Sequence, residues 1–190
     1  MQLKPVDTPD LLQLVGEWLA HKENYQWLDF GDGRQLVSAE WLKLAMQRGT
    51  YVLRVFTSNG ADRPIGVVGL SNVSSHFKTA SIWVVLGDRA HAGQGYASRA
   101  LSRMLTVGFS ELGLRSIHTW IVDDDRSIHL ARRVNFRLIG TQRQCHYIDG
   151  RPYDRLWFDL LACEHKEIED ARNDPAATSD REPVYNGTES

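Results

Sequence analysis

The chain has 190 residues, of which 42% are hydrophobic and 24% are charged, a composition typical of one globular domain. Its formal net charge of −2 argues against a dominant nucleic-acid-binding surface, and no apolar run approaches the roughly 18 residues of a membrane-spanning helix. The first ten residues include polar side chains and two prolines in place of the apolar stretch of a signal peptide, so we expect a cytoplasmic protein with no nucleic-acid or membrane partner.

The first half of the chain predicts one strand, two helices and then three strands. A strand over residues 3–6 precedes the segment 7–10, whose sequence DTPD offers a capping residue and a proline in the first helical turn. Ser38 is expected to cap a second helix with an apolar face. Three segments rich in β-branched and apolar residues then predict strands over residues 51–57, 65–70 and 80–86.

The second half alternates helices and strands. A helix over residues 96–112 follows a glycine-containing loop, and a strand and a short helix are expected over residues 116–122 and 127–134. Residues 138–148 and 153–161 predict a hairpin, because Asp149-Gly150 between them is a strong turn signal. This order predicts a single α/β (α+β) domain with a mixed central sheet of about six to seven strands and helices on both faces.

The end of the chain differs in composition from the rest. Residues 164–190 carry eight acidic residues against three Lys or Arg, and beyond Ile168 the only bulky apolar residues are Val184 and Tyr185. Such a segment buries too little apolar surface to offset the entropy lost on ordering. We therefore expect a folded domain over residues 1–163 and an acidic, largely disordered tail over residues 164–190.

The loop before the helix at residues 96–112 carries the strongest chemical signal. Backbone N–H groups at a helix start lack partners, and glycines such as Gly93 and Gly95 let a phosphate approach the backbone closely. A Rossmann fingerprint is disfavoured because Ser98 stands where the third glycine would be, and a P-loop would need a Lys and a Ser or Thr. A phosphate site and an ordinary turn before a helix both stay open from the loop alone.

Three segments, in order along the chain, resemble the GNAT acetyltransferases. Residues 93–101, GQGYASRAL, resemble the family's "GxGYAxxAL" motif, and residues 124–136, DDRSIHLARRVNF, resemble its "NxxSxxLxxKxGF" segment. Residues 150–157, GRPYDRLW, resemble the "GxxxD" hairpin of the branch that acetylates ribosomal-protein N-termini, which polyamine and amino-sugar acetyltransferases share. The resemblance covers residues 65–161, about half of the chain.

The resemblance implies a GNAT-like domain whose fourth and fifth strands, residues 80–86 and 116–122, splay apart. The pantetheine arm of acetyl-CoA, or of another acyl-CoA, would add to the sheet edge there, and the pyrophosphate would lie on the glycine loop. No metal is expected, because Asp123-Asp124-Asp125 lacks the spacing of a ligand set. The residues assigned to CoA are Trp83, Val84, Val85, Ala92, Gly93, Gln94, Gly95, Tyr96, Ala97, Asp124 and Ser127.

Acetyl transfer to an amine needs a base for the ammonium and an acid for the leaving thiolate. His118 is a candidate base because an imidazole titrates near neutral pH, although a structural histidine is the alternative. Ser127 matches a family serine that could act as an acid or hold a water, although it could equally be a helix cap. Ser81 stands where the family has a glutamate, and Ala131 where many members have a tyrosine.

The acceptor pocket is expected to draw on the loop after the first helix, the strand at residues 116–122 and the hairpin. Aromatic rings beside carboxylates suit a cationic amine or a sugar ring, although core packing is the alternative for the tryptophans. The residues assigned to the acceptor are Trp27, Asp29, Phe30, Trp120, His146 and Tyr147.

The sequence therefore predicts an acetyl-CoA-dependent N-acetyltransferase acting on a primary amine of a small molecule, such as an amino sugar, a polyamine or an aminoglycoside. One alternative is an enzyme that acetylates protein N-termini, and another is a non-catalytic CoA-binding module of the same fold. The sequence leaves the oligomeric state open, with a homodimer among the options.

Overall fold

The computed structural model describes residues 1–30, 37–122 and 125–168. Seven strands form one sheet in the order β1-β2-β3-β4-β5-β7-β6, and every neighbouring pair is antiparallel except the parallel pair β4–β5. The strands are β1 Leu3–Pro5, β2 Val52–Thr57, β3 Pro64–Ser74, β4 Thr79–Leu86, β5 Ser116–Val122, β6 Arg137–Ile148 and β7 Arg151–Leu161. The predicted mixed sheet is confirmed.

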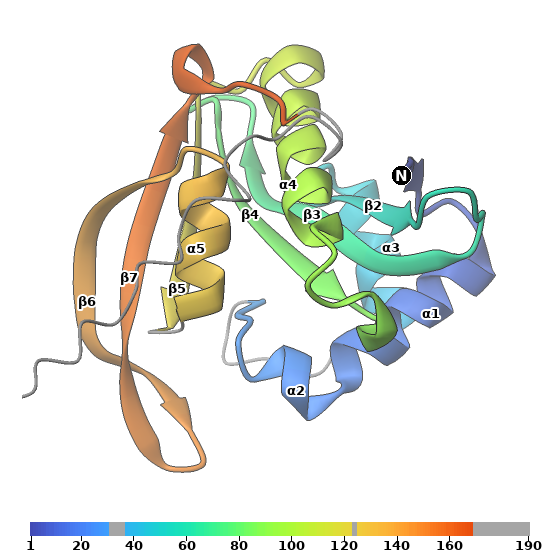
Figure 1. Cartoon of the computed structure of the whole chain (residues 1–190), viewed down its shortest axis with the longest axis horizontal. Helices are drawn as coiled ribbons and strands as arrows, with labels where there is room; N and C mark the ends of the chain where they lie inside the picture. Colours follow the sequence, from blue (N-terminus) through green and yellow to red (C-terminus); the bar gives the residue numbers. More distant parts are fainter. Residues whose placement is uncertain (31–36, 123–124, 169–190) are drawn as a thin grey trace, which may run out of the picture.

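Helices cover both faces of the sheet, as predicted (Figure 1). On one face, α1 and α3 pack onto β2–β4 through a core that includes Val15, Leu42 and Val67. On the other face, α4 and α5 pack onto the sheet through a core that includes Met104, Ile117 and Phe158. The α-helices are α1 Pro9–Ala20, α2 Lys22–Tyr25, α3 Ala39–Gln47, α4 Tyr96–Thr106 and α5 Asp125–Arg133.

Local sequence chemistry explains several element boundaries. The Thr8 and Ser38 hydroxyls accept hydrogen bonds from the N–H groups of Leu11 and Trp41, so both helices are capped as expected. In the hairpin turn, Asp149 and Gly150 both have positive φ, at 50° and 77°, as a two-residue turn of the I′ type requires.

Other boundaries differ from the prediction. The four-residue helix α2 was not predicted, and α4 ends at Thr106, where a single π-helical turn, Val107–Glu111, continues the chain. Within that turn Gly108 packs against β5, since a Cβ there would lie 2.7 Å from Ile117 Cδ1. Helix α5 begins at Asp125 and not at Ser127, so Ser127 lies inside its first turn.

The strands β4 and β5 are paired over only three positions. Thr79, Ala80 and Ser81 of β4 lie opposite Ser116, Ile117 and His118 of β5, and beyond this point the two strands separate (Figure 1). The sheet therefore opens at the ends of β4 and β5, as the resemblance implied.

After β7, a short 3₁₀ helix, Ala162–Glu164, leads to residues 165–168, which cross α4. The N–H of Ile168 donates to Ser102 Oγ at 2.8 Å, and the Ile168 side chain packs against the core on that face. Packing in the described residues thus reaches Ile168, and residues 169–190 of the expected tail lie outside the described residues. No helix within the described ranges combines the length and apolarity needed to cross a bilayer.

Candidate active site

The opening between β4 and β5 exposes one backbone edge of β4. On its other edge, Trp83, Val84 and Val85 pair with Gly69, Val68 and Val67 of β3. The register with β5 ends at Ser81, so β5 does not pair with this part of β4. An extended chain with amide groups could add to this edge as an extra strand does.

The glycine loop leaves open space in front of the start of α4. Gly93 and Gly95 have φ of +75° and +73°, a region that glycine adopts without strain. A Cβ at Gly93 would meet nothing within 4 Å, and one at Gly95 would meet only Ser98 Oγ at 3.9 Å. In the part of the chain that the structure describes, the N–H groups of Gly93, Gln94 and Gly95 donate no hydrogen bond. The loop therefore presents unpaired backbone N–H groups to an anion, in a conformation that its two glycines adopt without strain. The dipole of α4 adds partial positive charge at the same place.

Side chains behind the loop hold it in place. Arg99 is buried and donates to the carbonyl oxygens of Gly95 and Gln94, at 3.4 and 3.5 Å, and its guanidinium lies 4.6 Å from the centre of the Tyr96 ring. The Tyr96 hydroxyl accepts from the Asn59 N–H. Tyr96 is thus an anchor through its side chain and can offer a ligand only its backbone.

The helices α4 and α5 both begin at the end of the sheet where β4 and β5 open (Figure 1). A 3₁₀ helix, Arg89–His91, and the glycine loop connect β4 to α4, and α5 follows β5, so both N-termini lie near the carboxyl ends of these strands. The positive ends of two helix dipoles thus flank the opening. Ser127 lies in the first turn of α5 and is partly buried, whereas Asp124 lies outside the described residues.

At the point where β4 and β5 part, Ser81 Oγ lies 2.6 Å from His118 Nε2. The His118 ring also lies against Trp157, with the ring centres 5.8 Å apart. Burial lowers the pKa of His118 below its usual 6.5, and the charge of Asp159 opposes this in part. The imidazole is therefore mostly neutral at pH 7, which is the form that can accept a proton.

A second cluster joins the segment after α2 to the hairpin. The guanidinium of Arg155 pairs with Asp29 at 3.0 Å and lies 3.9 Å from the centre of the Trp120 ring. It also donates to His146 Nδ1, while His146 Nε2 donates to the Gln26 carbonyl at 2.6 Å. Burial lowers the pKa of His146, and the positive charge of Arg155 lowers it further.

A family model described as "Acetyltransferase (GNAT) domain" matches residues 1–137. The chain belongs to the GNAT acetyltransferase family. It is 32% identical over 98 residues to the uncharacterized N-acetyltransferase YoaA of Bacillus subtilis, and the aligned residues cover 51% of this chain and 55% of the relative. It is 31% identical over 105 residues to the uncharacterized N-acetyltransferase p20 of Bacillus licheniformis, and the aligned residues cover 55% of this chain and 58% of that relative. The chain thus spans little more than half the length of these relatives.

Among solved structures, the fold is similar to spermidine N-acetyltransferase from Vibrio cholerae in complex with CoA and spermine. The TM-score is 0.74 at 18% identity, over 86% of this chain and 96% of that one. A dodecameric structure of the same enzyme, described as an intermediate state, gives a TM-score of 0.71 at 19% identity, over 85% of this chain and 93% of that one. At this identity the likeness concerns the GNAT fold.

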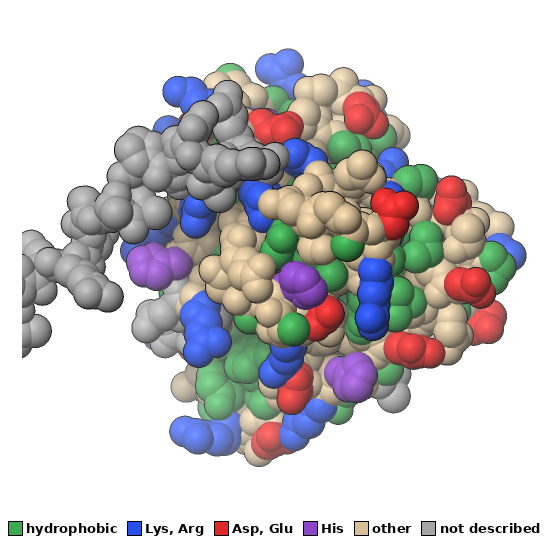
Figure 2. Space-filling view, turned by 45° about the vertical axis from the view of Figure 1, so that its right-hand side comes forward, with side chains coloured by type: hydrophobic (Ala, Val, Ile, Leu, Met, Phe, Trp, Pro, Cys, Tyr) green, Lys and Arg blue, Asp and Glu red, His purple; other side chains and the backbone are tan. Residues whose placement is uncertain are grey.

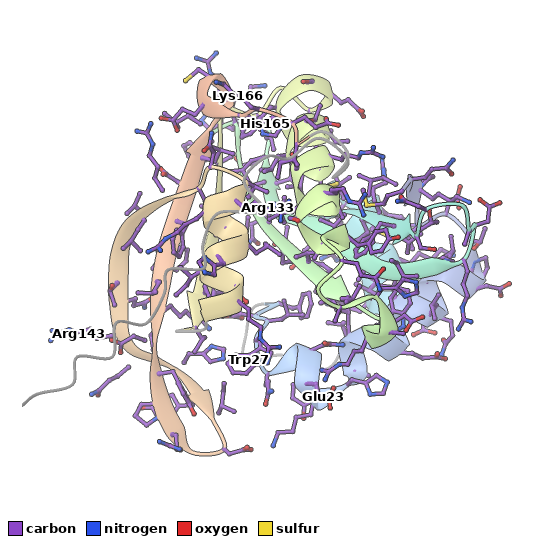
Figure 3. The ribbon with its side chains drawn as sticks, viewed as in Figure 1. Glu23, Trp27, Arg133, Arg143, His165 and Lys166 are labelled. Atoms are coloured by element: carbon purple, nitrogen blue, oxygen red, sulfur yellow. The ribbon has the colours of Figure 1, made fainter. Side chains whose placement is uncertain are left out.

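The predicted acceptor residues of this GNAT chain divide into three groups. Asp29, Trp120 and His146 come together in the cluster around Arg155. Trp27 is 43% exposed and lies beside α2, on the side of the β6–β7 hairpin, in the view of Figure 3. By contrast, Phe30 is buried between Trp41 and Trp83 in the α1–α3 core, and Tyr147 is 63% exposed. Tyr147 follows the inward-facing His146, and side chains alternate along a strand, so Tyr147 faces outward.

Two residues of these sites were not predicted, Arg99 and Arg155. Arg99 follows Gly95 by four residues, so one helical turn brings it back under the loop, a spacing that the sequence does display. Arg155 and Trp157 are two positions apart along β7, so the sequence indicates that they share a face of the sheet. It does not indicate the distant partner of Arg155, which is Asp29.

Over the face drawn in Figure 2, Lys and Arg side chains are interspersed with Asp and Glu, and no continuous basic surface is visible there. Near the glycine loop, Arg89 makes an ion pair with Glu23 of α2 and is exposed. This ion pair thus links the segment before the glycine loop to α2.

Proposed function

We propose that this GNAT protein is an acetyl-CoA-dependent N-acetyltransferase whose acceptor is a primary amine of a small molecule. The observation that carries the proposal is the divergence of β4 and β5 beside the open glycine loop at the start of α4. Together they offer a free strand edge for an amide-containing arm and backbone donors for a pyrophosphate. Coenzyme A contains both of these groups.

The residues fit the co-substrate in the following way. The backbone of Trp83, Val84 and Val85 would bind the pantetheine arm. The N–H groups of Gly93, Gln94 and Gly95, which are free within the described residues, would bind the pyrophosphate, whereas the N–H of Ala92 already donates to the Arg89 carbonyl. Acetyl-CoA supplies the thioester that the amine attacks, and another acyl-CoA would bind in the same way. Ser127, in the first turn of α5, is proposed to give a proton to the leaving sulfur.

The acceptor is proposed to approach from the face that carries His118, Trp120 and Arg155. The support is that these side chains share one face of β5 and β7. His118 lies where β4 and β5 part, and Trp120 and Arg155 follow toward the carboxyl end of β5. Aromatic rings there suit a cationic or sugar-like amine. The Asp29 carboxylate already pairs with Arg155, so its charge is partly neutralised toward a polyamine cation. We therefore propose an amino sugar or an aminoglycoside as the acceptor, in addition to the polyamine that the structural relative binds.

The test is release of free thiol from acetyl-CoA in the presence of spermidine, glucosamine, an aminoglycoside or short peptides with free N-termini. Acetylation of one of the small amines, identified by the mass of the product, is the expected result. Turnover with peptides alone would support the N-terminal acetyltransferase instead. If the protein binds CoA but turns over none of these amines, the non-catalytic module replaces the proposal.

No step of the proposed transfer needs a metal ion. The amine attacks the thioester directly, and the acid and base are side chains. We therefore expect that EDTA in excess leaves the initial rate of acetyl transfer unchanged. A loss of rate that added Mg²⁺ or Mn²⁺ restores would contradict this part of the proposal.

A further inference from the structure

The contact between Ser81 and His118 occupies a special place in the sheet. These two residues are the last pair of the parallel ladder before β4 and β5 separate. Their predecessors, Ala80 and Ile117, are buried under α4 and α5, so alternation directs Ser81 and His118 to the opposite face. Both side chains are only partly buried. The pair thus lies where the gap between β4 and β5 begins, on the face of the sheet proposed for the acceptor.

The geometry defines how a proton could reach His118. Ser81 Oγ is 2.6 Å from Nε2, so when Nε2 carries no proton the hydroxyl donates to it and lies between that nitrogen and the opening. Trp157 supports one side of the ring, and Asp159 of β7 is the direct cross-strand neighbour of His118. The charge of Asp159 favours the protonated form of the ring, which is the form that a base must become.

We propose that Ser81 and His118 form a two-residue proton relay that serves as the general base for the acceptor amine. The inference rests on the proposed function. The ammonium gives one proton to Ser81 Oγ while the Ser81 hydroxyl proton passes to His118 Nε2. The relay thus supplies, from two strands, the base that the family's glutamate would supply at position 81.

The step balances as follows. Once neutral, the amine nitrogen forms a bond to the thioester carbonyl carbon, and the carbon–sulfur bond breaks with its electron pair remaining on sulfur. The nitrogen loses its second proton as the sulfur gains one, so amide and free thiol result. The imidazolium then releases its proton to water, and no oxidant or reductant takes part.

The relay predicts a distinctive pH profile. With the best amine acceptor found among spermidine, glucosamine, an aminoglycoside and short peptides, kcat/KM of the wild type should rise with pH and level off once His118 is neutral. In His118→Gln we expect a loss of about a hundredfold or more near pH 7. Its rate should keep rising towards the amine pKa near about 10, because only the neutral amine then reacts.

The hydroxyl has its own test. Ser81→Ala should lower kcat about tenfold with little change in KM, as expected for loss of one hydrogen bond to the base. Ser81→Thr keeps a hydroxyl and should recover most of the rate. Matched controls are His76→Gln and Ser75→Ala, which are exposed in the turn between β3 and β4 and should behave as wild type. A wild-type pH profile in His118→Gln would overturn the relay.

A measurement without turnover separates the relay from the acetyltransferase proposal. In ¹⁵N NMR of the imidazole, the relay requires a neutral His118 at pH 7 with Nε2 unprotonated, and Ser81→Ala should change its titration. A cationic His118, or an Nε2–H tautomer, would overturn the relay even in an active enzyme. Failure of CoA binding by calorimetry in the wild type would instead overturn the proposed function.

Discussion

At the scale of single residues, His146 is held in one tautomer by its two partners. Arg155 can only donate, so Nδ1 must accept, and the Gln26 carbonyl can only accept, so Nε2 must carry the proton. Protonation of Nδ1 would place a new N–H against the Arg155 guanidinium. The cluster between the segment after α2 and the hairpin therefore depends on a neutral His146.

This arrangement predicts a loss of stability in mild acid. The pKa of His146 is lower in the folded chain than in the unfolded chain, where it is near 6.5, so the unfolded state binds a proton first as the pH falls. The free energy of unfolding should decrease below pH 6.5 until the folded pKa is reached. Thermal unfolding between about pH 7 and pH 5 measures this.

Burial lowers the pKa of His118 and His165 as well, so they contribute with the same sign. His146→Gln should therefore flatten part of the dependence, while His76→Gln, outside the cluster, should not. An unfolding temperature that is constant or rises from pH 7 to pH 5 would contradict the assignment.

Arg155 illustrates why part of the site could not be predicted from the sequence. Trp120, His146 and Asp29 were predicted from residue type and from the resemblance, because aromatic and acidic residues at these places suit an amine. The residue that joins them is 126 positions from Asp29 and reaches it only through the fold. By contrast, the glycines of the α4 loop are readable directly, since positive φ and open space are needed at those two positions.

We expect Arg155→Lys to weaken acceptor binding more than CoA binding. An ammonium cannot replace the planar fork that contacts Asp29, His146 and Trp120 together. The KM for the acceptor should rise about tenfold, as for loss of one charged hydrogen bond, with an unchanged Kd for CoA. Equal losses in both quantities would indicate a general effect on the fold.

At the scale of elements, the described strands and four of the five α-helices were predicted near their observed positions. Strand alternation, helix caps and the Asp149-Gly150 turn are local signals, and the chain follows them. The short α2, the π-helical turn and the irregular registers in β3 and β6 were missed. They arise from tertiary packing, which a local pattern does not contain.

Close packing at one strand glycine gives a stability prediction for the sheet. A Cβ at Gly66 of β3 would lie 2.6 Å from the carbonyl oxygen of Val85 and would also overlap the Phe56 ring. Gly66→Ala should therefore lower the free energy of unfolding by about 1–3 kcal/mol, measured by chemical denaturation. Gly140→Ala in β6 is the matched control, because nothing lies within 4 Å there. Equal stability of the two variants would contradict the packing described for β3.

At the scale of the whole molecule, residues 165–168, which follow β7 and its 3₁₀ helix, pack against α4. Thr106 Oγ1 lies 2.8 Å from His165 Nε2, and Ile168 contributes apolar contact to the core beneath α4. A chain ending after Ile168 should unfold like the full chain, since the composition of residues 169–190 predicts no packed core. A chain ending after Glu164 should lose about 1–2 kcal/mol. The reverse order of stability would contradict this assignment.

The most direct test of the central claim is binding of CoA, measured by calorimetry on the wild type and on Gly95→Trp. Gly95 has free space before it, so an indole there should fill the place proposed for the pyrophosphate and abolish binding. Gly49→Trp controls for backbone strain, because Gly49 also has a positive φ, +72°, and open space around it. The account predicts binding by the wild type and Gly49→Trp but not by Gly95→Trp. Absence of binding in the wild type, or unchanged binding in Gly95→Trp, would contradict it.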